Sequence, residues 1–473
     1  MLSIHNTLTR RKEQFRPIEP GKVRIYVCGI TTYDYCHLGH ARCLVAFDVV
    51  VRHLRHRGFE VTYVRNITDI DDKILKRAEE NGEVFSDLTG RFIAAMHEDE
   101  RALGILPPDE EPRATAHMEE IIAMIETLVR QEYAYRADNG DVYFSVLRFP
   151  QYGKLANKNL DELLSGARVE PGELKRDPRD FALWKASPDE GVGWDSPWGY
   201  GRPGWHIECS AMSCGKLGAH FDIHGGGSDL VFPHHENEIA QSVAATGEPF
   251  VNYWMHNGPL RIDDEKMSKS LGNFFTIREI LAKHDAEVVR HFLVSSHYRS
   301  PLNWSDQAMA QSSKALKRLY TALRGLDTAQ ARMLVNSRFE RAFNAAMDDD
   351  FNTPVALRAL FDLAREINRH RPGNEAAAAA ELGRLLVKLG GVLGILQSNP
   401  ETWLQGTDAE SIDTAKVESL IAARDQARAD KNWPEADRIR AELAAMNIIV
   451  EDRPGTSRWR VAAKAIGAKA IKG

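Results

Sequence analysis

Several features that would place the chain in a special class of protein are scarce or missing. Its 473 residues include five cysteines, an odd number without the spacing of a disulfide framework, which favours free or metal-bound thiols in a reducing cytosol. The first twenty residues carry charges and prolines and lack the apolar centre of a secretory signal. The longest apolar stretch, residues 376–396, contains three charged residues, so it predicts an amphipathic helix and no membrane span.

An excess of positive charge is also missing. The net charge is −6, so any surface that binds nucleic acid has to be a local patch. Hydrophobic residues make up 43% and charged residues 27% of the chain, which are ordinary values for a globular protein. The length predicts roughly three domains.

The stretch around which the chain is organised begins with an apolar run at residues 23–27. The run ends at Cys28, passes through a short polar turn and enters a helical pattern at residues 37–57, which opens with His37 and His40. A helix start offers unpaired N–H groups and a partial positive charge to phosphate, and the two histidines would add donors. Histidines at a helix start are also common as solvated or capping residues, so this pattern alone leaves both readings open.

A second informative stretch lies far along the chain, at residues 264–273, and reads DEKMSKSLGN. Lys266 and Lys269 lie three residues apart in a loop that contains glycine and serine. Because an ammonium group acts as a mobile point charge, both lysines can reach one polyphosphate. The two stretches together are therefore expected to hold a nucleotide from two sides.

The strings HLGH at residues 37–40 and KMSKS at residues 266–270 resemble, in this order and separation, the two signature motifs of class I aminoacyl-tRNA synthetases. The stretches GWHIECSAM at 204–212 and DIHGGGSDLVFPHHENE at 222–238 resemble those of the cysteinyl-tRNA synthetases in particular. The resemblance covers essentially the whole chain. Leu38 stands where the first signature more often has isoleucine, an exchange between similar apolar side chains.

The predicted fold class is α/β, with a Rossmann-like parallel-sheet catalytic domain split by a connective insertion, then a helical bundle and a small C-terminal α+β anticodon-binding domain. Strand, helix and strand within residues 23–67 predict a right-handed parallel unit. Helices are expected at 73–104 and 114–132, and a helical pattern throughout 275–397. The expected domains are the first catalytic half at 1–120, the insertion at 121–204, the second catalytic half at 205–256, a stem-contact region with the KMSKS loop at 257–310, the bundle at 311–400 and the anticodon-binding domain at 401–473.

Four residues from the two catalytic halves are candidate metal ligands. His234 and Glu238 lie four apart, so on one helix they share a face. With Cys28 and Cys209 they would supply two thiolates, an imidazole and a carboxylate, a set suited to zinc. The spacing lacks the Cys-x-x-Cys rhythm of a zinc finger, so the residues alone leave buried structural cysteines as an alternative, and His235 could replace His234. The resemblance assigns the ligands to Cys28, Cys209, His234 and Glu238.

Zinc would also explain how cysteine is chosen over serine. An apolar pocket rejects a substrate of similar shape by only about 10²-fold, whereas loss of a strong polar contact can reach roughly 10⁴- to 10⁵-fold. Because zinc favours thiolate over hydroxyl, the metal can provide that contact and no editing domain is required.

The resemblance implies that cysteine is activated with ATP to cysteinyl-adenylate and then transferred to the 3′-terminal ribose of tRNA(Cys). His37, His40, Lys266 and Lys269 are expected to be catalytic through the phosphates and the leaving pyrophosphate, with Mg²⁺ bridging phosphate oxygens. The expected ATP-binding residues are these four together with Gly227 and Asp229. The expected walls of the amino-acid pocket are Thr68, Trp205 and His224, for which core packing of Trp205 is the alternative.

The tRNA surface is expected at the carboxyl end, where no acidic residue follows Asp452 and several basic residues do. Aromatic and charged side chains there could stack on and pair with unstacked anticodon bases. The expected contacts are Trp433, Asp437, Arg440, Arg458 and Trp459.

The chain is expected to be a cytoplasmic monomer. The alternatives are a ligase that joins cysteine to an amino sugar in mycothiol synthesis, which would lack the terminal domain, and a non-catalytic zinc protein that binds RNA.

Overall fold

The structure is a computed structural model that describes residues 1–159, 174–187, 191–262, 265–266, 274–371, 375–405, 414–446, 448–453 and 456–461. The chain forms two compact units. The first contains Met1–Ser312, Asn336–Ala359 and Val392–Ile395, and the second contains Ser313–Val335, Leu360–Gly391 and Leu396–Gly473. Within the described ranges, no helix combines the length and the apolar character needed to cross a membrane.

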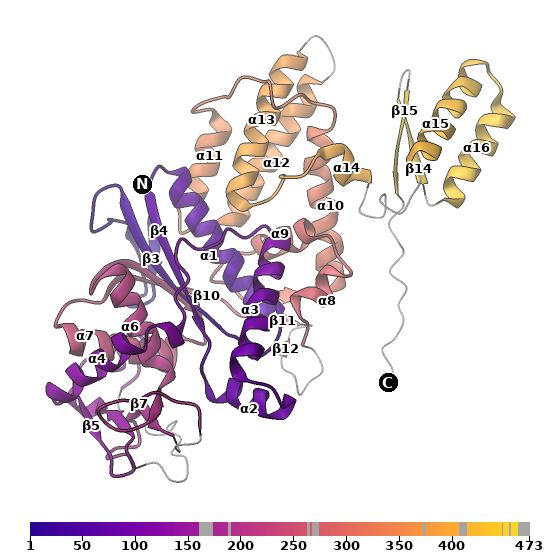
Figure 1. Ribbon diagram of the computed structural model, residues 1–473. Coiled ribbons are helices and arrows are strands. Elements are labelled where there is room, and N and C mark those ends of the chain that lie inside the picture. The colour runs from indigo at the N-terminus through magenta and orange to yellow at the C-terminus, as the bar shows by residue number, and fades with distance from the viewer. Residues whose placement is uncertain are drawn as a thin grey trace. The chain divides into compact units, whose positions relative to one another are not determined.

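A four-stranded parallel sheet forms the centre of the first unit. Its order is β10 (Val251–Asn257), β9 (Phe221–Gly227), β3 (Lys22–Thr31) and β4 (Glu60–Thr68). Helix α1 (Leu38–His56) covers one face, and α6 (Trp205–Leu217) and α7 (Glu236–Thr246) cover the other (Figure 1). This arrangement confirms the predicted α/β fold. Because all four strands are parallel, their carboxyl ends meet at one edge, the usual place for a ligand.

Close packing fixes both helical layers on the sheet. A side chain at Gly225 of β9 would collide with the ring of Phe47 on α1, since an added Cβ would lie 2.2 Å from that ring. On the opposite face, Met212 of α6 is fully buried and belongs to the same apolar cluster as Tyr26 and Val64. The helices therefore hold the strand ends in a fixed arrangement.

A second, antiparallel sheet lies within the range expected for the insertion. Its strands are β5 (Ala134–Arg136), β6 (Val142–Phe144), β7 (Phe181–Ala186) and β8 (Gly201–Pro203), paired in chain order. Helix α4 (Met118–Arg130) packs with it around a buried core that includes Phe144 and Trp184. The last strand leads directly into α6.

Two predicted elements differ from the structure. The single helix expected at 73–104 is two helices, α2 (Asp72–Asn81) and α3 (Phe85–Ala102), because Gly82 takes a left-handed conformation with φ 64° and ends α2. The helical pattern expected throughout 275–397 is interrupted by β13 (Leu302–Trp304), which pairs in parallel with β11 (Leu260–Ile262). On its other side β11 pairs with β12 (Glu265–Lys266).

Most of the remaining elements of the two units are helices. They are α8 (Ile277–Leu281), α9 (Ala286–Val294), α10 (Asp306–Leu323), α11 (Arg338–Met347), α12 (Thr353–His370), α13 (Ala376–Leu393) and α14 (Pro400–Gln405). A short amino-terminal hairpin, β1 (Ser3–Asn6) and β2 (Arg11–Gln14), precedes the sheet.

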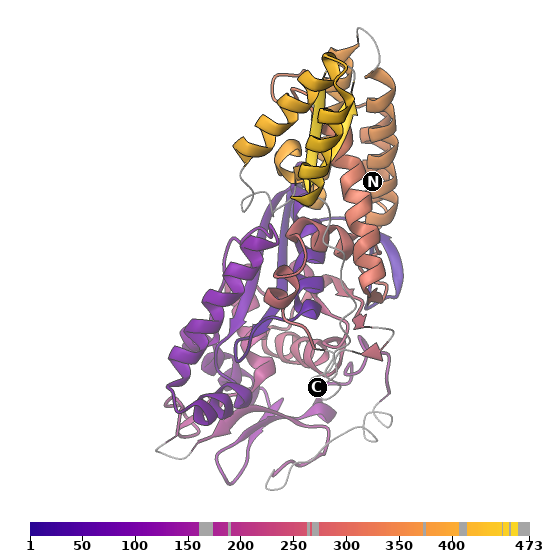
Figure 2. The same ribbon diagram turned by 90° about the vertical axis from the view of Figure 1, so that its right-hand side faces the viewer.

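The carboxyl end of the described chain is a helical pair followed by a hairpin, in agreement with the predicted small α+β domain. Helices α15 (Thr414–Ala429) and α16 (Trp433–Ala445) lie against the antiparallel strands β14 (Ile448–Arg453) and β15 (Thr456–Val461) (Figure 2). Val417, Ile439, Leu443 and Trp459 form its buried core.

Candidate active site and metal centre

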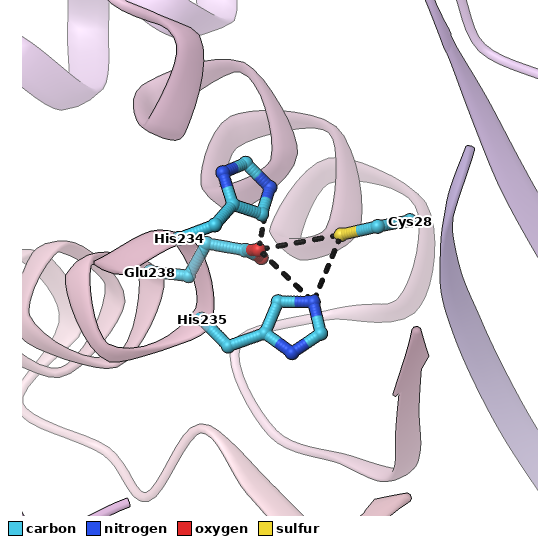
Figure 3. A group of neighbouring side chains, drawn as sticks. All are labelled: Cys28, His234, His235 and Glu238. Atoms are coloured by element: carbon cyan, nitrogen blue, oxygen red, sulfur yellow. Dashed lines mark hydrogen bonds and ion pairs between the residues drawn. The ribbon is translucent and has the colours of Figure 1, made fainter. Parts of the chain in front are cut away.

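Ligand-type side chains from both halves of the parallel sheet converge at its carboxyl edge. Cys28 is on β3, while His234 and His235 end the turn η3 (Val231–His235) and Glu238 lies in the first turn of α7. All four residues are buried, and each offers one ligand atom within 4.8 Å of the others (Figure 3). Cys28 Sγ lies 3.4 Å from Glu238 Oε1, and His234 Nε2 lies 3.1 Å from the same oxygen.

Cys209, the fourth predicted ligand, lies beside this group. It comes from α6, its Sγ is 3.8 Å from Cys28 Sγ, and it hydrogen-bonds with His234. His235 Nε2 also faces the group, at 3.3 Å from Cys28 Sγ. The structure thus brings the four predicted residues together and adds His235, the alternative raised from the sequence.

The pKa values around the group are strongly displaced. The hydrogen bond from Cys28 lowers the pKa of Cys209 to about 6, against the effect of burial. Burial alone would lower the pKa of His234, but Glu238 and Cys209 outweigh it and raise the value to about 10. Burial likewise opposes ionisation of Glu238, yet His224 and His234 hold its pKa well below the usual range. The cluster therefore favours a thiolate and a carboxylate, the forms that bind a metal, together with a protonated His234 whose proton a metal would displace.

Three further histidines support the cluster. His234 Nδ1 contacts His206 Nδ1 at 2.8 Å. Because the pKa of His234 is raised to about 10 while burial holds that of His206 well below its usual range, the proton lies on His234, which donates to His206. His234 Nε2 is thereby left facing Glu238. His224 Nε2 lies 2.8 Å from Glu238 Oε2, and His256 Nε2 lies 2.7 Å from His235 Nδ1. Sequence reasoning missed His206 and His256, although the first lies inside a motif stretch at residues 204–212.

His37 and His40 form a capping box at the start of α1. The backbone N–H of His40 donates to His37 Nδ1 and the backbone N–H of His37 donates to His40 Nδ1, both at 3.2 Å. Their rings stack with centroids 3.5 Å apart. Burial, with His37 nearby, holds the pKa of His40 well below its usual range. Because each Nδ1 accepts, each neutral ring carries its proton on Nε2 and can donate it outwards.

The other predicted residues of the catalytic domain lie at the same sheet edge or next to it. Thr68 ends β4, His224 lies on β9 and Gly227 ends β9, with Asp229 exposed just beyond. A Cβ on Gly227 would lie 2.4 Å from Asp229 Oδ1, so the Asp229 side chain lies directly over this glycine. The Trp205 indole stacks on the His234 ring at 4.2 Å. The Lys266 backbone ends β12, whereas the side chain of Lys266 and all of Lys269 lie outside the described residues.

The expected tRNA contacts differ widely in exposure. Trp433 at the start of α16 is 58% exposed, and Asp437 and Arg440 on the same helix are exposed. Trp459 is only 5% exposed and packs in the core against the helical pair, so its indole is not available for stacking in this conformation. The side chain of Arg458 lies outside the described residues.

Comparisons with known proteins agree with this geometry. Residues 14–314 match the catalytic domain of class I (C) tRNA synthetases, residues 342–397 match the DALR domain, and residues 414–460 match the cysteinyl-tRNA ligase anticodon binding domain. The solved structure of Mycobacterium tuberculosis methionyl-tRNA synthetase in complex with methionyl-adenylate shares the fold, with a TM-score of 0.55 and 17% identity, over 79% of this chain and 89% of that one.

Fold and catalytic-domain match together define a class I aminoacyl-tRNA synthetase. Cysteine–tRNA ligase of Alkalilimnicola ehrlichii is 63% identical over 97% of this chain and its own full length, and that of Thioalkalivibrio sulfidiphilus is 62% identical over the same shares. The chain belongs to the cysteinyl-tRNA ligase family.

Proposed function

We propose that this chain activates L-cysteine with ATP to cysteinyl-adenylate and pyrophosphate, then transfers the cysteinyl group to the 3′-terminal ribose of tRNA(Cys). The observation that carries the proposal is the convergence of Cys28, Cys209, His234 and Glu238 at the sheet edge where α1 begins, in a chain of this family.

The spacing of the four side chains supports zinc as the bound metal. Two thiolates at about 2.3 Å from a tetrahedral ion lie about 3.8 Å apart, a thiolate and a carboxylate oxygen about 3.6 Å apart, and a nitrogen and an oxygen about 3.4 Å apart. The corresponding distances here are 3.8 Å, 3.4 Å and 3.1 Å. His234 is favoured over His235 as the nitrogen ligand, because it is the one that contacts Cys209.

Selection of cysteine is proposed to depend on this centre. When bound, zinc supplies an electrophilic centre that takes the substrate's sulfur as thiolate and discriminates against a hydroxyl. Thr68, Trp205 and His224 are proposed as the surrounding walls of the pocket. His224 holds Glu238 and Trp205 covers His234, so both also fix the ligands in place.

Activation needs aligned charge and no side-chain nucleophile, since the substrate's carboxylate attacks the α-phosphate. His37 and His40 are proposed to donate from Nε2 to phosphate oxygens as negative charge develops. Lys266 and Lys269, with Mg²⁺, are proposed to neutralise the leaving pyrophosphate. Gly227 and Asp229 are proposed to receive adenosine, the carboxylate accepting from ribose hydroxyls.

The terminal domain is proposed to bind the anticodon through Trp433, Asp437 and Arg440, with Arg458 on the neighbouring strand. Trp459 is proposed to support this surface from the core beneath it. We further propose a cytoplasmic monomer. The five cysteines are all free thiols, as in a reducing compartment, and light scattering would test the monomer.

A cysteine-dependent ATP–pyrophosphate exchange assay, followed by charging of purified tRNA(Cys), tests the proposal. We expect exchange that needs the bound metal and charging that needs the terminal domain. Exchange without tRNA charging would favour a ligase for an amino sugar, and the absence of both from metal-loaded protein would favour a non-catalytic RNA-binding protein.

A further inference from the structure

The segment that follows the second signature stretch returns directly to the start of α1. Leu38 N donates to Phe275 O at 3.1 Å, and Ile277 N donates to Cys36 O at 2.8 Å. His37 and Thr276 thereby face each other as an antiparallel bridge. The start of α1 and the segment just after the second signature stretch, more than 200 residues apart in sequence, are thus joined by main-chain hydrogen bonds at one point.

Arg278 links the segment that pairs with the start of α1 to helix α3. It is the second residue of α8, which Thr276 and Glu279 cap reciprocally. The Nη2 group of Arg278 donates to Ala95 O at 2.9 Å and to Glu98 Oε2 at 2.8 Å, and its Nε lies 3.2 Å from Asp99 Oδ1. One guanidinium therefore anchors the root of α8 to the last turns of α3.

The same guanidinium also reaches the loop before α1. Its central carbon lies 4.8 Å from the ring centre of Tyr35, two residues before His37, which is a cation–π contact. Tyr35 in turn packs edge-on against Phe92 of α3 at 5.2 Å. Arg278 thus connects the α8 root, the loop that leads to His37, and α3.

We infer that Arg278 is a positioning residue for adenylate formation. It holds the carboxyl-side root of the loop that carries Lys266 and Lys269 in register with His37 and His40. The amino-side root is held separately, because Lys266 pairs with Arg261 of β11. The inference rests on the proposed function, in which these four side chains act on one polyphosphate.

An arginine suits this task better than a lysine. Its planar fork can bond a carbonyl and two carboxylates while its face lies on an aromatic ring, and an ammonium group cannot do both. The Arg278 side chain is 36% exposed, so its ion pairs contribute little to stability. The catalytic rate, in contrast, is sensitive to positioning, since a displacement of about 1 Å far from the reacting atoms can lower it roughly 10²-fold.

Arg91 provides a matched control. It lies on α3, its guanidinium carbon is 5.1 Å from the ring centre of Phe92, and it pairs with Glu83 through two hydrogen bonds of 2.7 Å and 2.9 Å. It therefore makes the same kinds of contact as Arg278, yet none of these contacts is with the loop before His37 or the root of α8.

The experiment compares R278A, R278K, Y35L and R91A in the full-length, zinc-loaded protein. Readouts are kcat and the KM values for ATP and cysteine in exchange, single-turnover transfer from preformed cysteinyl-adenylate to tRNA, zinc content and thermal midpoint. For R278A we expect kcat of exchange to fall about 10- to 10²-fold with an unchanged KM for cysteine. Zinc content and transfer should stay unchanged, because transfer uses no pyrophosphate contact. R278K should lose most of the rate, Y35L less, and R91A none.

Three results would overturn the inference: exchange by R278A within about twofold of the unchanged protein, an equal loss in R91A, or an equal loss in transfer. If R278A is poorly folded, Y35L decides the question, because it leaves the ion pairs of Arg278 intact and removes one partner. Failure of the proposed function is distinguishable, since the unchanged protein would then show no cysteine-dependent exchange at all.

Discussion

Two groups of potential metal-ligand side chains lie in the described part of the catalytic domain. They differ in how the negative charge of their acidic side chains is balanced. Cys28, His234, His235 and Glu238 form one, and His97, Glu100 and Glu111 form the other. The first is buried throughout and includes a thiol. The second combines a buried glutamate with two partly exposed residues and includes none.

The difference lies in the source of positive charge. In the second group, Arg65 from β4 lies 2.8 Å from Glu100 and 2.6 Å from Glu111, and His97 lies 2.7 Å from Glu111. In the first group, Glu238 pairs with His224, His234 and His235. The guanidinium of Arg65 supplies a permanent positive charge in the second group, whereas the first group has only the proton of His234, which a metal can displace. A cluster of His, Cys, Asp and Glu side chains therefore indicates a metal site only when no arginine or lysine already pairs with its carboxylates.

Cys28→Ser should give the largest effect, because it removes a ligand from the group that lacks a fixed cation. We expect zinc content to fall towards zero and the preference for cysteine over serine in ATP–pyrophosphate exchange to drop from roughly 10⁴ towards the 10² of shape alone. Metal analysis and exchange with each amino acid would measure this. Cys214→Ser, on the same helix as Cys209 but outside the ligand group, is the matched control and should change neither value. A metal-free, folded protein that kept its preference would contradict the role of the metal.

Arg65→Met should be next in size, since it leaves the buried Glu100 and the half-covered Glu111 without their cation. Its own side chain is 1% exposed, and removing one partner of a buried pair typically costs about 3–5 kcal/mol of unfolding free energy. Burial already raises the pKa of Glu100 although Arg65 opposes it, and losing Arg65 raises it further. A raised carboxyl pKa means that the folded state binds the proton more tightly, so the deficit should shrink as pH falls from 8 to 5.5. Denaturant titrations at both pH values would show this, and a deficit independent of pH would contradict it.

The comparison also shows what sequence can and cannot supply. The strand, helix and strand around Cys28 were predictable because apolar periodicity is a local signal, although β3 continues through Gly29 to Thr31, where a turn was expected. The convergence of Cys28 with Cys209 came from family resemblance, since no spacing rule joins residues so far apart. Arg65 and His206 went unnoticed because their roles exist only through partners on other elements. Trp459 was expected on the surface, but its position in the hairpin places its side chain in the buried core.

His206→Ala should have a smaller effect on the metal than loss of a ligand. His206 accepts the Nδ1 proton of His234 and so fixes the tautomer that presents Nε2 to the cluster. Losing such a supporting contact typically lowers metal affinity about 10- to 10²-fold, which competition with a fluorescent zinc chelator would measure. His220→Ala is the control, because His220 contacts Asn252 away from the cluster. Equal affinities in both variants would mean that His234 needs no such support.

His97→Ala should have the smallest effect and is the direct test of the difference between the two groups. The His97 side chain is 35% exposed and its ion pair with Glu111 is one of two that this carboxylate makes, so its removal should cost about 0–1 kcal/mol. Because Arg65 already pairs with both glutamates, zinc bound per chain should stay at one in the variant and in the unchanged protein. A second equivalent of zinc that disappears with His97 would show that an ion can displace the guanidinium, and the distinction drawn from Arg65 would fail.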